Sequence, residues 1–206
     1  MAEGPKLITG ADGKTRCWWC GDDPLYVEYH DHEWGLPVDD DVRLFEKICL
    51  EGFQAGLSWI TVLRKREDFR KAFAGFDPAR VARFSRAKVA SLVINAKIIR
   101  HRGKIESTIN NAKQALHLAD EFGSLSSFFW QYEPDSQPEF DGCRSITPES
   151  KTLSKELKRR GWSFVGPTTC YAFMQAMGMV NDHLPGCHSF RSVEERRKLL
   201  RASSAK

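Results

Sequence analysis

Apolar residues recur at helical spacing along much of the chain. After three aspartates at positions 39–41, one run continues beyond Gly52 and Gly56 and comprises Val42, Leu44, Phe45, Ile48, Cys49, Leu57, Ile60, Val62 and Leu63. Apolar positions three or four residues apart form one face of an amphipathic helix. The pattern therefore predicts two helices, or one helix broken near Gly52.

Capping signals predict further helices. Asp77 followed by Pro78 is an N-cap with proline at the first helical position, and Ser85 precedes an amphipathic run over 87–93. A longer helix is predicted from one apolar face: Ile105, Ile109, Ala112, Leu116 and Ala119.

The last third of the chain reads as loop, helix, short turn and helix. Prolines, serines and aspartates gather over 133–148, the next helix ends in basic residues before Gly161, and an apolar helix over 168–177 is closed by Gly178. Residues 148–178 therefore have the shape of a helix-hairpin-helix. The alternative is an ordinary corner between two helices, with a solvated basic end.

A helix-hairpin-helix offers backbone N–H groups to a DNA phosphate without reading sequence. We expect these contacts around Gly166 and Thr168, beside the basic residues 158–160. The hairpin reads Phe164-Val165-Gly166, where glycine-x-glycine is usual.

The 206 residues predict one mainly α-helical domain, since no sustained strand alternation and no internal repeat occurs. We expect a flexible leader over 1–15, the domain over 16–190 and a charged tail over 191–206.

Composition restricts the function classes only modestly. Hydrophobic residues make up 41% and charged residues 28%, as in ordinary globular proteins. No stretch reaches the ~20 apolar residues of a membrane span, and residues 1–16 lack the apolar core of a secretory signal, so we expect a cytoplasmic protein. The net charge of +4 permits an anionic partner without requiring one.

Cysteines and histidines near both chain ends predict a metal site. In a reducing cytosol the six cysteines are expected to be buried or metal-bound. Two pairs, Cys17 with His30 and His183 with Cys187, together suit tetrahedral zinc. Rival ligands are Cys20, His32 and His188, and unrelated cysteines and histidines are the plainer alternative.

Aromatic residues crowd the first third of the chain around one carboxylate. They are Trp18, Trp19, Tyr26, Tyr29, Trp34 and Trp59, and the carboxylate is Glu51 in an apolar stretch. Aromatic faces stack on an extruded base and attract a cationic one. The alternative is that the aromatics fill the core and that Glu51 is a solvated helix-end residue.

Long strings of the sequence resemble one family. They run in order from about Arg16 to Cys187 and include Asp23-Pro-Leu-Tyr-Val-Glu-Tyr-His-Asp-His-Glu-Trp-Gly35, Leu44-Phe-Glu-Lys-Ile-Cys-Leu-Glu-Gly52, Gln54-Ala-Gly-Leu-Ser-Trp-Ile-Thr-Val-Leu63, Ile98-Ile-Arg-His-Arg-Gly-Lys-Ile105 and Asn181-Asp-His183. Together they resemble the 3-methyladenine DNA glycosylase I family. The chain departs from the family pattern at Phe53 and Lys97 and in its longer tail after Phe190.

The resemblance implies an all-α helix-hairpin-helix glycosylase fold in which a structural zinc joins the two ends of the chain. It implies zinc ligands at Cys17, His30, His183 and Cys187, and a base pocket of Glu51 as the catalytic residue with Tyr29, Trp59, Trp19 and Tyr26. Leu57 is implied as the wedge that fills the gap left by a flipped nucleotide.

The implied activity is hydrolysis of the N-glycosidic bond of 3-methyladenine, in base excision repair. The expected partner is double-stranded DNA with alkylated adenine, the free base is the product, and a monomer is expected. We assign Asp182 no catalytic role, because this family is thought to lack the aspartate that related enzymes use. The hairpin offers no evident lysine nucleophile, which favours hydrolysis without strand cleavage.

Two other function classes compete with this interpretation. A damage-recognising DNA-binding module would keep the hairpin and the zinc without the chemistry, but Glu51, Tyr29 and Trp59 argue against it. A zinc hydrolase of small molecules would need an open coordination position, which two cysteines and two histidines do not leave.

Overall fold

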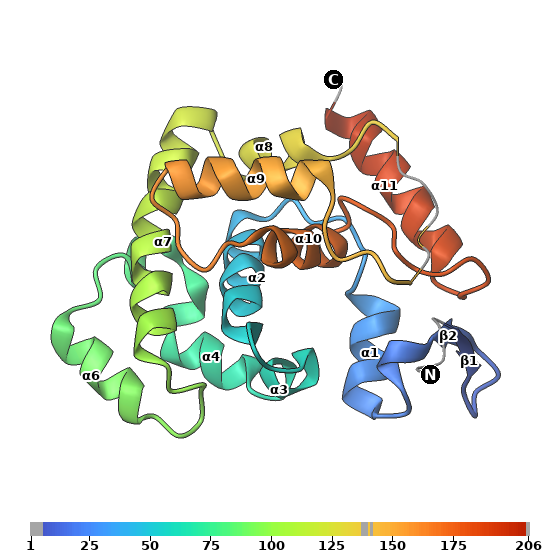
Figure 1. Ribbon diagram of the computed structural model, residues 1–206, viewed down its shortest axis with the longest axis horizontal. Coiled ribbons are helices and arrows are strands. Elements are labelled where there is room, and N and C mark those ends of the chain that lie inside the picture. The colour runs from blue at the N-terminus through green and yellow to red at the C-terminus, as the bar shows by residue number, and fades with distance from the viewer. Residues whose placement is uncertain (1–5, 137–139, 141, 205–206) are drawn as a thin grey trace.

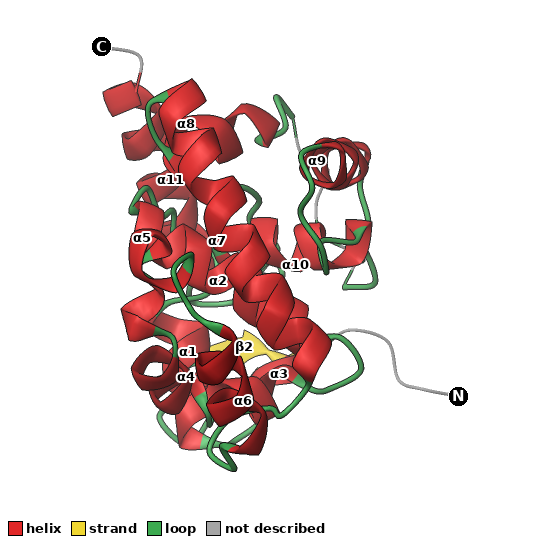
Figure 2. Ribbon diagram, turned by 90° about the vertical axis from the view of Figure 1, so that its left-hand side faces the viewer, coloured by secondary structure: helices red, strands yellow, loops and turns green. Residues whose placement is uncertain are grey.

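The computed structural model describes residues 6–136, 140 and 142–204, and within them the fold is mostly helical, as predicted (Figures 1 and 2). The strands are β1 (Leu7–Thr9) and β2 (Thr15–Cys17), and the helices are α1 (Pro24–His32), α2 (Asp41–Gln54), α3 (Trp59–Leu63), α4 (Arg66–Ala72), α5 (Pro78–Val81), α6 (Arg86–Ile94), α7 (Arg102–Phe122), α8 (Leu125–Phe129), α9 (Pro148–Arg159), α10 (Pro167–Ala176) and α11 (Phe190–Ser204). Short 3-10 turns span Trp18–Cys20, Ala74–Phe76 and Trp130–Tyr132.

The first predicted helical run forms two helices, and the break lies after Gly52. Helix α2 begins after the N-cap Asp40, whose side chain accepts from the amide of Arg43, and it continues through Gly52 to Gln54. Gly56 then adopts a φ of +83°, a left-handed conformation that glycine tolerates best. This turn separates α2 from α3 and leaves Leu57 exposed.

Part of the segment expected to be a flexible leader forms a β-hairpin. Strands β1 and β2 are antiparallel, with Leu7 opposite Cys17 and Thr9 opposite Thr15. Two strands of three residues are too short to show alternation along a sequence, so this hairpin escaped prediction. The tail beyond residue 190 forms the basic helix α11 as far as Ser204.

Helix α2 is the centre of the hydrophobic core. All residues from Leu44 to Phe53 are buried, and α2 contacts α7, α8 and α10. Helix α10 packs against both α2 and α9, as Figure 1 shows. Strands β1 and β2 lie beside α1 (Figure 1), and the amide of His188, just before α11, donates to the carbonyl oxygen of Thr15 in β2. Segments near the two ends of the chain therefore lie side by side.

The segment predicted as a hairpin consists of α9, a short turn and α10. Thr147 caps α9 in a capping box with Ser150, and Pro167 occupies the first turn of α10 after the N-cap Gly166. The turn is braced from α7, because the carbonyl oxygen of Ser163 accepts hydrogen bonds from Ser107 and Asn111. No helix in the described ranges is both long enough and apolar enough to cross a membrane.

Candidate active site

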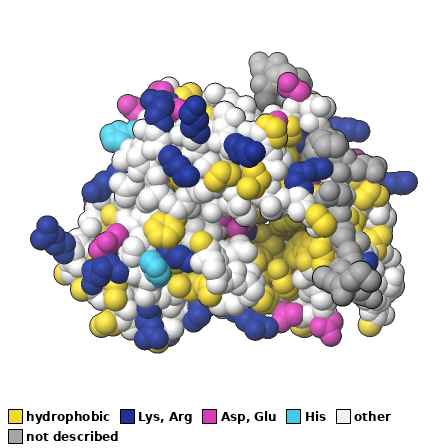
Figure 3. Space-filling model, viewed as in Figure 1, with side chains coloured by type: hydrophobic (Ala, Val, Ile, Leu, Met, Phe, Trp, Pro, Cys, Tyr) yellow, Lys and Arg dark blue, Asp and Glu magenta, His cyan; other side chains and the backbone are white. Residues whose placement is uncertain are grey.

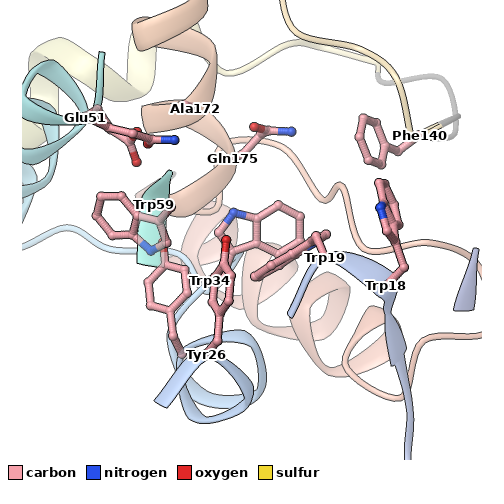
Figure 4. A pocket seen from close by; sticks show the side chains of 11 residues that line it. Trp18, Trp19, Tyr26, Trp34, Glu51, Trp59, Phe140, Ala172 and Gln175 are labelled. Atoms are coloured by element: carbon pink, nitrogen blue, oxygen red, sulfur yellow. The ribbon is translucent and has the colours of Figure 1, made fainter. Parts of the chain in front are cut away.

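A cavity of about 190 Å³ opens between α1 on one side and α2, α3 and α10 on the other. Figure 3 shows it as a hollow with hydrophobic walls on one face of the molecule. Its walls are Trp18, Trp19, Tyr26, Tyr29, Trp34, Glu51, Gln54, Trp59, Phe140, Ala172 and Gln175. All five base-pocket residues named from the sequence therefore line one space (Figure 4).

The carboxylate of this cavity belongs to Glu51, which is 5% exposed in the last turns of α2. A buried carboxylate without a partner is costly, and here the ammonium of Lys47 lies 2.7 Å from Glu51 Oε1. Figure 4 shows Glu51 beside Trp59, at the end of the cavity opposite Trp18 and Phe140. Glu51 is thus a partnered residue of the cavity wall, and the alternative of a solvated glutamate is wrong.

Lys47 is a residue of the site that sequence reasoning missed. Its Nζ atom donates to the hydroxyl of Tyr29 over 2.7 Å and lies 3.3 Å from the centre of the Trp59 ring. Burial lowers the pKa of Lys47, and the nearby Glu51 carboxylate opposes that shift. Its position four residues before Glu51 on a helix was the available signal.

The aromatic walls pack against one another. The Tyr29 and Trp59 ring centres are 5.4 Å apart, and Trp19 contacts both Tyr26 and Trp34 at 5.1 and 4.9 Å. Burial raises the pKa of Tyr26 to about 12, and raises that of Tyr29 still more clearly, so both hydroxyls stay protonated at neutral pH.

The indole nitrogen of Trp59 is buried and has no hydrogen-bond partner. Nearly all buried polar groups in proteins are paired, so this donor lacks an acceptor that the described residues supply. The nitrogen is not exposed to the cavity, so its lack of a partner identifies no ligand by itself. Because the aromatic residues line an open cavity, they do more than fill the core.

Gln175 on α10 is a second polar wall residue that the sequence did not reveal. Its amide nitrogen donates to Asp182 over 2.7 Å, and the same carboxylate oxygen accepts from the Tyr171 hydroxyl over 2.5 Å. Burial raises the pKa of Asp182. Asp182 therefore stands behind Gln175 and orients it, which agrees with assigning Asp182 no catalytic role.

Cys17, His30, His183 and Cys187 form one buried group beside the cavity, and their donor atoms all lie within 4.8 Å of one another. The Sγ atom of Cys187 is 3.4 Å from His183 Nδ1 and 3.5 Å from His30 Nε2, and Cys17 Sγ is 3.8 Å from His183 Nδ1. Neighbouring donors around a tetrahedral zinc ion are separated by about 3.3–3.8 Å. The group fits a tetrahedral metal ion.

The outer nitrogen of each histidine in this group is also engaged. His30 Nδ1 lies 2.9 Å from Asp31 Oδ1, and His183 Nε2 lies 3.1 Å from the carbonyl oxygen of Trp34. Such outer contacts fix the orientation of metal-binding imidazoles. Hydrogen bonding from the Cys17 thiol and from both histidines lowers the pKa of Cys187, and the same contact with Cys187 raises the pKa of Cys17. Without a metal ion the two sulfur atoms therefore share one proton.

The rival ligands occupy other places. Cys20 Sγ donates to the carbonyl oxygen of Cys17, and His32 is exposed next to Glu28. His188 Nε2 lies 2.9 Å from Asp31 Oδ1, at the outer edge of the four-residue group. His30, Asp31 and His188 also cluster, but His30 already belongs to the inner group and Asp31 contacts its outer nitrogen.

The residues expected to contact DNA lie at exposed turns. Leu57 is 42% exposed at the turn between α2 and α3, and Thr168 is exposed at the start of α10, next to the partly buried Gly166. The basic residues are less available than the sequence suggested. Arg159 pairs with Glu156, and Arg160 pairs with Glu156 and Glu121.

Comparison with known proteins places this fold and cavity in one family. The family model described as methyladenine glycosylase matches residues 19–191. The DNA-3-methyladenine glycosylase 1 of Escherichia coli is 50% identical over 178 residues, which is 84% of this chain and 95% of that protein. The DNA-3-methyladenine glycosylase of Haemophilus influenzae is 48% identical and is covered to 96%.

Solved structures agree with these sequence matches. A crystal structure of a 3-methyladenine DNA glycosylase I has a TM-score of 0.79 and 51% identity, over 84% of this chain and 98% of that one. A variant of such an enzyme in complex with 3-methyladenine has a TM-score of 0.80 and 35% identity, over 85% and 97%. Because these matches cover most of the chain and nearly all of each relative, the protein belongs to the methyladenine glycosylase family.

Proposed function

We propose that the protein hydrolyses the N-glycosidic bond of 3-methyladenine in alkylated DNA and releases the free base. The observation that carries this proposal is the cavity itself. It joins one buried carboxylate, Glu51, to aromatic walls. Behind the surface of the cavity lies the unpaired indole N–H of Trp59, to which we propose that the bound base offers an acceptor. A flipped purine with a positive charge and both donor and acceptor edges suits such a cavity.

The reaction requires little acid catalysis by the protein. Adenine methylated at N3 is cationic in DNA, so the C1′–N9 bond can break with its electron pair moving to the base, which leaves neutral. The sugar takes over the positive charge, water attacks C1′, and a proton is lost. Aromatic faces and a free lone pair of Glu51 hold the base during this step, and Gln175 presents a fixed amide nearby.

The same residues explain how neutral adenine is rejected. Neutral adenine gains less from the aromatic faces and from Glu51, and it is a poor leaving group. Discrimination thus combines binding with chemistry, and the protein needs no covalent intermediate. The product is a base and an intact strand with an abasic site.

For DNA binding we propose a helix-hairpin-helix formed by α9 and α10. Backbone amides near Gly166 and Thr168, at the N-terminus of α10, would hold a phosphate, with the exposed Lys158 nearby. Leu57 is proposed as the wedge, because an apolar side chain exposed on a tight turn could enter the space between base pairs. A cytoplasmic monomer remains our expectation for the protein as a whole.

The metal that we propose for the buried group is a structural zinc ion held by Cys17, His30, His183 and Cys187. Two cysteines and two histidines fill a tetrahedral shell and leave no position for water or substrate. The ion would tie β2 and α1, which carry Cys17 and His30, to the segment before α11. It would also fix α1, which carries Tyr26 and Tyr29 into the cavity.

Product identification tests the proposed reaction. Wild-type protein is incubated with duplex DNA treated with a methylating agent, and the released bases are separated by chromatography. We expect 3-methyladenine as the main product, with the DNA strand intact until alkali cleaves the abasic sites. A protein that binds this DNA but releases no base would instead be a damage-recognition module.

A further inference from the structure

Lys47 stands behind the wall of the base cavity. Tyr29 and Trp59 line the cavity of about 190 Å³ and also a smaller space of about 30 Å³ on their other side. Lys47 lines the smaller space, and its ammonium lies 3.3 Å from the centre of the Trp59 ring. One aromatic ring thus separates a buried positive charge from the place where the base stacks.

Four of the other five charged residues that line the smaller space form ion pairs, and the fifth, Arg43, is exposed. Arg66 forms a two-pronged ion pair with Glu33, and Arg70 pairs with Glu46 and Glu67. The charge of Lys47 is opposed by Glu51, at 2.7 Å, and Lys47 is only 6% exposed. Lys47 and Glu51 therefore form the charged pair that faces the base cavity.

A cationic base and the Lys47 ammonium would compete for the same attractive groups. The ammonium already uses one face of Trp59 and one oxygen of Glu51, which are the two groups that attract a positive base. A base stacked on the opposite face of Trp59 would lie roughly 7 Å from the ammonium, a distance at which like charges in a protein wall still repel.

This repulsion changes during the reaction. In the bound substrate the positive charge lies on the base, next to the Trp59 wall. As the C1′–N9 bond breaks, the electron pair moves to N9, and the charge moves to the sugar. The like charges therefore separate as the transition state is approached, so a cation behind the wall weakens substrate binding more than transition-state binding.

From this geometry we infer that Lys47 is a specificity-determining residue. Its charge lowers the affinity for the cationic base and raises the rate at which the bound base is released. The inference rests on the proposed function, since it needs a substrate whose charge leaves the base on cleavage. The competing interpretation is that Lys47 merely orients Glu51 and supports Tyr29.

The test compares Lys47→Met, which keeps the length of the side chain and removes its charge, with Lys47→Arg, which keeps the charge. Single-turnover release of 3-methyladenine from methylated duplex is measured against enzyme concentration. The maximal rate and the half-saturating concentration are thereby obtained separately. Thermal stability and affinity for undamaged duplex report on folding and on general DNA binding.

For Lys47→Met we expect the half-saturating concentration and the maximal rate both to fall, each on the order of 10-fold. Lys47→Arg is expected to restore the wild-type balance. Free 3-methyladenine, measured at a pH where it is neutral, should not gain affinity for Lys47→Met. A lower maximal rate with unchanged or weaker substrate binding would overturn the inference.

The double variant Lys47→Met with Glu51→Gln separates the two interpretations. If Lys47 acts by its own charge, its removal shifts rate and affinity in the same directions in the Glu51→Gln background. If it only orients Glu51 and supports Tyr29, its removal there leaves substrate affinity unchanged or weaker, and the inference is wrong. A wild-type protein that releases no 3-methyladenine would refute the proposed function itself, which is a different result.

Discussion

At the residue scale, the two buried glutamates of α2 differ in the residues that they contact. Glu46 and Glu51 are both nearly buried in α2, yet Glu46 pairs with Arg70 and Glu51 lines the aromatic cavity beside Lys47. The sequence could single out Glu51 because aromatic residues crowd the same region. It could not reveal Gln175 and Phe140, because only the folding of the chain brings them to the cavity.

Phe53 is the reverse case: its position in the sequence suggests the site, but the structure places it in the core. The residue departs from the family pattern two positions after Glu51. In the structure Phe53 is 1% exposed and packs on Phe69, with ring centres 4.6 Å apart. Its direction on the helix, which its position beside the motif did not indicate, places it in the core.

Two replacements of Trp59 separate its ring from its N–H group. Trp59→Phe keeps an aromatic face and removes the donor, and we expect about 5- to 10-fold slower excision, the loss of one hydrogen bond of about 1 kcal/mol. Trp59→Ala should be slower still, because the stacking surface is also lost. Single-turnover base release, with thermal stability as the folding control, checks both. Equal rates for wild type and Trp59→Phe would show that the base does not use the indole N–H.

At the element scale, local signals predicted the helices that begin with strong caps. Asp77 and Ser85 each cap a helix as expected. Helices α1, α4 and α8 were missed, since they are short and their apolar residues do not repeat over several turns. Tertiary packing, more than local periodicity, holds such elements in place.

The end of α2 depends on a lysine from another element. Lys104 at the start of α7 is 7% exposed, and its Nζ atom donates to the carbonyl oxygens of Phe53 and Ala55. These carbonyls close α2 just before the turn that carries Leu57, so a cation here caps the helix terminus and fixes the turn. Burial lowers the pKa of Lys104.

Lys104→Met should therefore lower the free energy of unfolding by about 1–3 kcal/mol, because two carbonyl oxygens lose a charged donor. Chemical denaturation measures this change. Lys113→Met removes an exposed lysine of the same helix and should stay within about 0.5 kcal/mol of wild type. Equal stability of the two variants would mean that the α2 terminus needs no cap from α7.

At the scale of the whole molecule, the two ends of the chain are joined beside the cavity. The amide of His188 donates to the carbonyl oxygen of Thr15, and Cys17 and Cys187 lie in one buried group that could hold a metal ion. The sequence predicted this meeting from residue types at both ends. It could not predict the hairpin of β1 and β2, which is ordered by contacts that span the length of the chain.

Loss of one metal ligand should loosen this junction. For Cys17→Ser we expect bound zinc to be lost and Tm to fall by roughly 5 °C or more, since 1 kcal/mol corresponds to roughly 2–4 °C in a domain of this size. Elemental analysis and calorimetry measure the two effects. Cys143→Ser, at an exposed cysteine, is the matched control and should leave both unchanged. Full zinc occupancy in Cys17→Ser would remove the assignment.

DNA binding should be driven by phosphate contacts with little sequence preference. Affinity for undamaged duplex is expected to fall steeply with salt, and the slope of log affinity against log salt should be similar for unrelated sequences. Fluorescence anisotropy at several salt concentrations measures this slope. Binding that selects one sequence and ignores salt would contradict a hairpin that holds backbone phosphate.

The central claim is that the base is held and excised in the Glu51 cavity, and a comparison of two glutamates on one helix tests it most directly. Single-turnover release of 3-methyladenine from methylated duplex is measured for wild type, Glu51→Gln and Glu46→Gln. Glu51→Gln should slow release by about 1–3 kcal/mol, or roughly 5- to 150-fold, with fold and zinc content retained. Glu46→Gln should release the base at nearly the wild-type rate. Wild-type rates in folded, zinc-loaded Glu51→Gln would contradict the account.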